Sequence, residues 1–140
     1  MDKILTIAIP TYNRKQKLLR LLKSIEREEC TDKYKIIISD NCSNYSVEDF
    51  INEEFESDFI SVITVVRRSI NAGGDYNITS LYTYADTKLF WIIGDDDELV
   101  PGAINTVVEY YYKYPDIPFY KYVMRGAFEF SDDIKMKNVD

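Results

Sequence analysis

Four consecutive acidic residues, Asp95, Asp96, Asp97 and Glu98, follow the most apolar strand-like stretch of the chain, residues 89–93, with only Gly94 between. Carboxylates this close repel one another and cost stability unless a cation offsets them. Mg2+ and Mn2+ prefer hard oxygen ligands, usually one or two carboxylates together with phosphate oxygens. On an extended backbone Asp95 and Asp97 would share a face, so at most two of these aspartates are expected to contact one ion. The alternative is a solvated acidic turn in which Asp97 or Glu98 only favours the next helix N-terminus.

Three other segments place polar groups directly after apolar, β-branched runs. Pro10-Thr11-Tyr12-Asn13 offers a hydroxyl, an aromatic ring and an amide, which suit a flat heterocycle, although Asn13 could serve only as a helix cap. Asp40 could accept a hydrogen bond from a base or a ribose, or only close an Asx turn. Asn71-Ala72-Gly73-Gly74 could bring backbone close to a ligand or form an ordinary turn.

The composition bounds the chemistry. The 140 residues are 46% apolar and 29% charged, which is enough for one compact domain with its own core. There is no histidine, so catalysis must use carboxylates, hydroxyls, lysines or a metal ion. Lysine and arginine total 17 and aspartate and glutamate 24, and the resulting net charge of −7 argues against nucleic acid as a partner. Locally, Arg67 and Arg68 could neutralise phosphate, although a solvated strand end is more typical.

The location and redox state follow from what the sequence lacks. Cys30 and Cys42 form no C-x-x-C pair and are expected to be reduced thiols. We find no signal-peptide pattern and no apolar run of about 18 residues, so a cytoplasmic protein is expected. Peripheral association with the inner face of the membrane stays open.

Strand-like and helix-like segments alternate along the chain. We expect strands over 4–9, 34–39, 59–66, 89–93 and 119–130, and helices over 14–28, 46–55, 75–85 and from 101 to Pro115. Ile78, Leu81, Tyr82 and Ala85 are expected on one face of the third helix, with Asp75 as its cap. This alternation predicts an α/β fold, a three-layer α/β/α sandwich with a mainly parallel sheet. Ligands bind such sheets at the carboxyl ends of the strands, so the four polar segments should meet there.

Taken together, these segments resemble the family-two glycosyltransferases of Rossmann-like GT-A fold. The resemblance rests on residues 4–14, 36–43, 71–74 and 91–99, in that order, and it covers about Ile4 to Pro115. It implies that residues 1–140 form a single, partial GT-A domain that holds the donor-binding half. The implied activity is transfer of a sugar from a nucleotide sugar, most commonly a UDP-sugar, to a hydroxyl of a carbohydrate or lipid-linked acceptor.

The resemblance also assigns residues to roles. The implied nucleotide-sugar site consists of Pro10, Thr11, Tyr12, Asn13, Asp40, Asn71, Gly73 and Asp95. The implied metal ligands, for Mn2+ or Mg2+, are Asp96 and Asp97. The family motif is often Asp-x-Asp-Asp, and Gly94 stands here where its first aspartate is often found, which shifts the ribose role to Asp95 and the metal role to Asp96.

The implied mechanism inverts the anomeric carbon. A carboxylate deprotonates the acceptor hydroxyl while the metal neutralises the leaving diphosphate. The family's general base lies in the second half of the domain, so it is expected beyond Asp140. The late acids of this chain, Glu129, Asp132 and Asp133, have no spacing that singles one out.

Two other classes of function are consistent with an α/β sheet. One is a non-catalytic nucleotide-binding or assembly module, which would form a stable homo-oligomer insensitive to nucleotide and metal. The other is a phospho-receiver domain. Such a domain needs acids after its first strand and a single acceptor aspartate after its third, whereas here the first strand leads into Pro10-Thr11-Tyr12-Asn13 and the acidic run follows the fourth.

Overall fold

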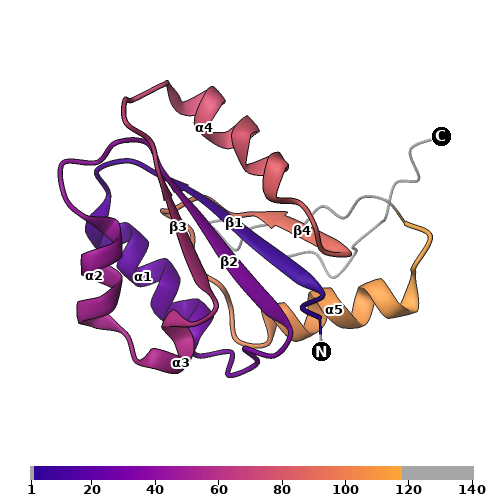
Figure 1. Ribbon diagram of the computed structural model, residues 1–140. Helices are drawn as coiled ribbons and strands as arrows, with labels where there is room; N and C mark the ends of the chain where they lie inside the picture. Colours follow the sequence, from indigo (N-terminus) through magenta and orange to yellow (C-terminus); the bar gives the residue numbers. More distant parts are fainter. Residues whose placement is uncertain (1, 118–140) are drawn as a thin grey trace, which may run out of the picture.

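The computed structural model describes residues 2–117, in which helices cover both faces of a four-stranded parallel sheet (Figure 1). The strands are β1 (Leu5–Thr11), β2 (Tyr34–Asp40), β3 (Ile63–Arg67) and β4 (Leu89–Ile92), and they lie in the order β3-β2-β1-β4. The helices are α1 (Lys15–Glu26), α2 (Val47–Glu54), α3 (Ser57–Ile60), α4 (Gly74–Ser80), the 3-10 turn η1 (Leu81–Tyr84) and α5 (Ala103–Lys113). The three-layer α/β/α fold with a parallel sheet is confirmed. The strand expected over 119–130 lies outside the described residues.

The two faces of the sheet carry different side chains because successive residues of a strand point to opposite sides. On one face Ile7 of β1 and its register partner Ile36 of β2 belong to the main core, beneath α1, α2, α3 and α5. On the other face Ala8 and Ile37 pack with Leu81 beneath α4 and η1 (Figure 1). Burying one isoleucine side chain contributes roughly 1.5–3 kcal/mol, so the main core dominates the stability of the sheet.

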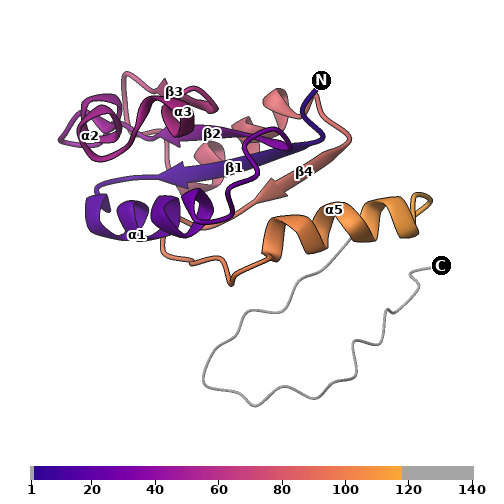
Figure 2. The same ribbon diagram turned by 90° about the horizontal axis from the view of Figure 1, so that it is seen from below.

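The last described helix, α5, begins beside the C-terminal end of α1 (Figure 2). The Glu28 carboxylate accepts hydrogen bonds from the backbone N–H groups of Gly102 (2.9 Å) and Ile104 (3.1 Å), which satisfies donors that the helix itself cannot. The sequence predicted a helix from residue 101, but α5 begins at Ala103, so Pro101 precedes it. Gly102, at φ 82°, is the cap residue between Pro101 and the helix. Within residues 2–117, no helix is both long enough and apolar enough to cross a lipid bilayer.

The first strand runs two residues further than the sequence predicted, through Pro10 to Thr11. Proline has no backbone N–H and is tolerated only where a neighbouring strand does not need that donor. β4 pairs with β1 only as far as Ala8, whereas β2 continues beside β1 to Thr11. Pro10 thus lies where the β4 side of β1 is already unpaired, and the extension carries Thr11 to the carboxyl edge of the sheet.

Two other predicted boundaries were wrong. Asn13 does not cap α1: the cap position is Arg14, without a side-chain hydrogen bond, and Asn13 adopts a positive φ of 50°. Phe59 and Ile60 belong to α3 instead of the third strand. The ring of Phe59 packs against that of Phe55, with centroids 5.0 Å apart, so an apolar side chain that looked like a strand residue is buried from a helical turn.

The predicted inner face of the third helix was also wrong. Leu81 is buried, but Ile78 and Tyr82 are 40% and 60% exposed, and the buried residue of α4 is Asn77. The cap is Gly73, and Asp75 lies in the first turn. Asn77 faces the sheet because its amide forms hydrogen bonds there. Nδ2 donates to the Ser39 carbonyl (3.0 Å), and Oδ1 accepts from the Ser39 hydroxyl (2.6 Å) and from Arg68 Nε (3.2 Å).

Asn77→Leu tests whether α4 is held by these hydrogen bonds. We expect the free energy of unfolding to fall by about 1–3 kcal/mol although leucine is more apolar, because Ser39 and Arg68 lose their buried partner. Urea denaturation followed by circular dichroism measures the change. The control is Ile78→Asn on the exposed side of the same helix, expected within about 0.5 kcal/mol of the parent. A larger loss in the control would mean that the apolar face dominates.

Candidate functional site

The carboxyl ends of the strands bring the four polar segments together, as the fold predicts (Figure 1). The Thr11 hydroxyl at the end of β1 donates to Asp95 Oδ2, after β4, at 2.9 Å. The backbone N–H of Asn41, after β2, donates to the Thr11 carbonyl at 3.0 Å. The Asn41 side-chain amide donates to Asn71 Oδ1, after β3, at 2.8 Å. Polar contacts therefore connect all four strand ends at one edge of the sheet.

The acidic run forms a tight turn, not the extended segment that the sequence analysis assumed. The backbone N–H of Asp97 donates to the Gly94 carbonyl (3.0 Å), and Asp97 Oδ2 accepts from the Gly94 N–H (3.2 Å). The expectation that Asp95 and Asp97 share a face is therefore wrong, because Asp97 folds back onto the start of the turn. Instead Asp95 and Asp96 both approach Arg14, whose Nη1 lies 3.1 Å from Asp95 Oδ1 and 3.5 Å from Asp96 Oδ2.

The three aspartates of the turn differ in accessibility. Asp95 is only 4% exposed, and its two oxygens accept from Thr11 and Arg14. The Asp96 side chain is 50% exposed, and its one hydrogen bond within residues 2–117 is the long one to Arg14. Asp96 is therefore the carboxylate of this turn that is best placed to meet a ligand.

Asp40 is completely buried at the end of β2. Its Oδ1 accepts from the Ser43 backbone N–H (2.9 Å), which is the Asx turn weighed in the sequence analysis, and its Oδ2 accepts from Arg67 Nη1 (2.6 Å). Arg67 also donates from Nη2 to the Ser43 carbonyl (2.7 Å). Asp40 thus shapes the turn that follows β2, and a bond to a base edge would have to share an oxygen that already accepts.

The loop after β1 is fixed to the same turn. The Asn13 backbone N–H donates to the Ser43 hydroxyl (2.9 Å), and Asn13 Oδ1 accepts from the Asn44 N–H (2.7 Å). Pro10 is half-buried within the strand, whereas Tyr12, directly before Asn13, is 42% exposed. Of the residues in this loop, Tyr12 is the one that presents an open surface to a flat ligand.

The loop after β3 is docked on Asn41. Asn41 Oδ1 accepts from the Ala72 N–H (2.9 Å), while Asn71 Oδ1 accepts from both the Asn41 amide and the Gly73 N–H (2.9 Å). Gly73 has a φ of 90°, which only glycine adopts without strain. Asn71 and Gly73 therefore hold their loop against the end of β2.

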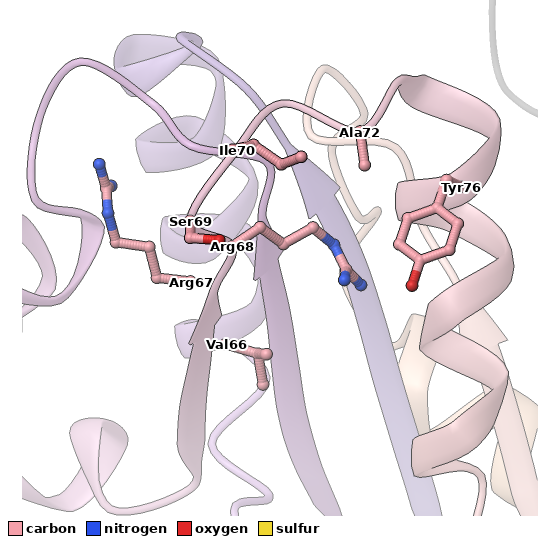
Figure 3. A pocket seen from close by; sticks show the side chains of 7 residues that line it. All are labelled: Val66, Arg67, Arg68, Ser69, Ile70, Ala72 and Tyr76. Atoms are coloured by element: carbon pink, nitrogen blue, oxygen red, sulfur yellow. The ribbon is translucent and has the colours of Figure 1, made fainter.

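Arg67 and Arg68 point to opposite sides of β3, as alternation along a strand requires (Figure 3). Arg67 turns towards Asp40. Arg68 turns towards α4, where it bonds to Asn77 and Ser80 and lies 4.8 Å from the centre of the Tyr76 ring. The cavity around Arg68, about 370 Å3, also includes Val66, Ser69, Ile70 and Ala72. Both arginines thus form hydrogen bonds with other residues of the chain. The interpretation that they lie at a solvated strand end was wrong.

Arg14, Asn41, Ser43 and Tyr45 also contribute to the site. The first three lie within the segments 4–14 and 36–43 that the sequence analysis selected, although it gave none of them a role of its own. Tyr45 lies outside those segments, and no sequence signal pointed to it. Its hydroxyl is buried without a hydrogen-bond partner among the described residues. Burial, reinforced by the charges of Asp40 and Asp95, raises the pKa of Tyr45 to about 12.

No group of three aspartate, glutamate or cysteine side chains within residues 2–117 is arranged to hold a metal ion. The accessible donors are Asp96 and the Asp97 oxygen that does not bond to Gly94. This donor set fits Mg2+ or Mn2+ only if a ligand supplies further oxygens, which is the usual arrangement for a cation that binds together with phosphates.

Residues 6–135 match Glycosyl transferase family 2. The chain belongs to this family. The abequosyltransferase RfbV of Salmonella typhimurium is 33% identical over 115 residues, which are 81% of this chain and 34% of that protein. The GalNAc(5)-diNAcBac-PP-undecaprenol beta-1,3-glucosyltransferase of Campylobacter jejuni is 27% identical over 105 residues, which are 75% of this chain and 33% of that protein. The chain therefore spans about a third of the length of these family 2 relatives.

Solved structures agree with the GT-A fold expected for the family. TarS 1-349 from S. aureus, in complex with UDP-GlcNAc, has a TM-score of 0.70 at 17% identity and covers 81% of this chain and 32% of that one. The mannosyltransferase PcManGT from Pyrobaculum calidifontis, in complex with GDP-Man and Mn2+, has a TM-score of 0.67 at 17% identity and covers 79% of this chain and 33% of that one.

Arg67→Met tests the ion pair under the candidate site of this family 2 chain. We expect the free energy of unfolding to fall by roughly 2–3 kcal/mol, because Asp40 is left charged and buried without its partner. The loss is smaller than for a fully buried pair because Arg67 is half exposed. Chemical denaturation measures the loss. Adding Asp40→Asn to the same protein should recover part of it. Additive losses in the double variant would show that the pair is not coupled.

The raised pKa of Tyr45 predicts a loss of stability at high pH. Tyrosine in the unfolded chain titrates near 10.0, below the folded value of about 12. Stability from this group is therefore fully present below pH 10.0 and is lost as the pH rises towards 12. Tyr45→Phe should move the alkaline unfolding midpoint, followed by circular dichroism, to higher pH. The exposed Tyr112→Phe is the control and should leave the midpoint unchanged.

Proposed function

We propose that this chain is the donor-binding part of a GT-A glycosyltransferase domain, which binds a UDP-sugar with a divalent cation and transfers the sugar to a hydroxyl acceptor with inversion. The observation that carries the proposal is the meeting of the Thr11, Asp40, Asn71 and Asp95 segments at one sheet edge, in a chain of family 2. The TarS structure with UDP-GlcNAc and the PcManGT structure with GDP-Man and Mn2+ support a nucleotide-sugar ligand.

The exposed and buried groups of the site suit different parts of such a donor. The Tyr12 ring offers a stacking surface for the base, and the docked loop of Asn71 and Gly73 offers backbone beside it. Asp40 holds the turn beneath the base through Arg67 and Ser43. Asp95, assigned to the ribose, is held by Thr11 and Arg14, so a ribose hydroxyl would bond to an oxygen that accepts from one of them.

The metal is assigned to Asp96, with Asp97 as a second ligand. Asp96 is half exposed and Asp97 has one oxygen left, so together they fit one cation whose other ligands are diphosphate oxygens. When bound there, a divalent cation neutralises charge on the departing diphosphate. The chain's own part in this step is to hold the carboxylates in a fixed turn so that no reorganisation is needed as charge develops.

The proposed reaction is a single displacement. The acceptor hydroxyl gives its proton to the general base, a carboxylate expected beyond Asp140, as its oxygen attacks the anomeric carbon. The bond from that carbon to the diphosphate oxygen breaks, and UDP leaves from the opposite face, which inverts the configuration. The acceptor hydroxyl belongs to a carbohydrate or a lipid-linked carbohydrate; the Campylobacter jejuni relative is named for an acceptor of the second kind.

Titration of the chain with UDP in the presence and absence of Mn2+ tests this proposal. We expect Mn2+ to strengthen UDP binding by about tenfold, equivalent to ~1.4 kcal/mol, and Asp96→Asn to remove most of that gain. Isothermal titration calorimetry measures both. The control is Glu98→Gln, which removes a neighbouring negative charge outside the turn and should keep the Mn2+ effect. Absence of UDP binding in the parent chain, with or without Mn2+, would refute the donor site.

A further inference from the structure

Arg14 already occupies the charge-neutralising position beside the acidic turn. Its Nη1 is shared between Asp95 Oδ1 at 3.1 Å and Asp96 Oδ2 at 3.5 Å, and within residues 2–117 its side chain makes no other hydrogen bond or ion pair. The two contacts differ. Asp95 is buried and fixed by Thr11, whereas Asp96 and Arg14 are both half exposed and meet only at the long end of hydrogen-bonding distance.

We infer that Arg14 is an internal counterion that competes with the metal for Asp96 and so makes metal binding depend on the nucleotide. The inference rests on the function proposed above. A guanidinium this close to an oxygen of Asp96 repels a divalent cation that approaches the same carboxylate. A cation arriving alone must displace Arg14 without any new partner for it, so its binding is weakened.

The arrival of a diphosphate changes this balance. The Arg14 guanidinium has five N–H donors, of which only Nη1 is used here, and charge-assisted bonds from guanidinium to phosphate are strong. Arg14 can therefore release Asp96 and take up a phosphate oxygen while it stays paired with Asp95. The Thr11 hydroxyl keeps Asp95 in place during the exchange. Metal and nucleotide then bind cooperatively. The diphosphate gives Arg14 a new partner when the cation displaces it from Asp96, and the cation neutralises Asp96 beside the diphosphate.

A second arginine on the same acidic run provides a matched control. Arg27 Nη2 lies 3.3 Å from Glu98 Oε1, and both side chains are at least half exposed. Arg27→Gln removes the same charge as Arg14→Gln and also leaves one carboxylate of the run unpaired. It differs in that neither Arg27 nor Glu98 belongs to the tight turn of 94–97.

The experiment measures Mn2+ binding directly, from the loss of the electron paramagnetic resonance signal of free Mn2+, with and without UDP. In the parent chain we expect weak binding of Mn2+ alone and stronger binding with UDP. Arg14→Gln should strengthen binding of Mn2+ alone by about fivefold, the size expected for one half-exposed ion pair, and reduce the gain produced by UDP. Arg27→Gln should match the parent in both measurements.

Arg14→Lys keeps the positive charge but not the planar shape of the guanidinium, so it separates these two properties. It is also a second variant in case Arg14→Gln does not fold. Lysine keeps the positive charge, so Mn2+ alone should bind as weakly as in the parent chain, with the thermal midpoint confirming that each variant is folded. If Arg14→Gln binds Mn2+ alone no better than the parent, and UDP still strengthens binding equally in both, the counterion role is refuted while the donor site stands. If UDP does not strengthen Mn2+ binding even in the parent chain, both the counterion role and the metal-dependent donor site are refuted.

Discussion

Two carboxylates are buried at the carboxyl edge of the sheet, and the shape of the site depends on how each is neutralised. Asp40 pairs with Arg67 at 2.6 Å, and Asp95 pairs with Arg14 at 3.1 Å. A buried carboxylate without a partner costs several kcal/mol, so each pair holds the segment that supplies the arginine against the segment that supplies the acid. In both pairs the carboxylate is buried and the guanidinium is half exposed.

This arrangement divides the site into a fixed frame and an open surface. Amide and hydroxyl side chains form the frame and bond to backbone groups of neighbouring loops: Asn13, Asn41, Ser43 and Asn71. The open surface is made by Tyr12 and by the Asp96 carboxylate, both exposed, and Asp96 bonds among residues 2–117 only to Arg14. A rigid frame lowers the entropy cost of binding, because the loops are already ordered before a ligand arrives.

Much of this could be read from the sequence. Apolar periodicity placed every described strand and nearly every helix, and the rule that parallel strands present ligands at their carboxyl ends brought the right four segments together. The failures at Asn13 and Asn77 depended on contacts between distant residues. Asn13 looked like a cap because its partner, Asn44, is 31 positions away. Asn77 is buried in place of Ile78 because its amide bonds to Ser39 and Arg68. The spacing of apolar residues along a helix does not predict such bonds.

Gly94 gives the acidic turn room to fold tightly. A Cβ at Gly94 would lie 3.0 Å from Asp96 Oδ1 and 3.2 Å from Asp97 Oδ2, closer than side chains normally approach. An aspartate there, as the family motif often has, would require the Asp96 and Asp97 side chains to shift from these positions. In this turn one oxygen of Asp97 accepts from the Gly94 N–H, and Asp96 stays half exposed, with Arg14 as its one side-chain partner among residues 2–117. A glycine at this position is therefore compatible with the proposal that Asp96 is the first metal ligand.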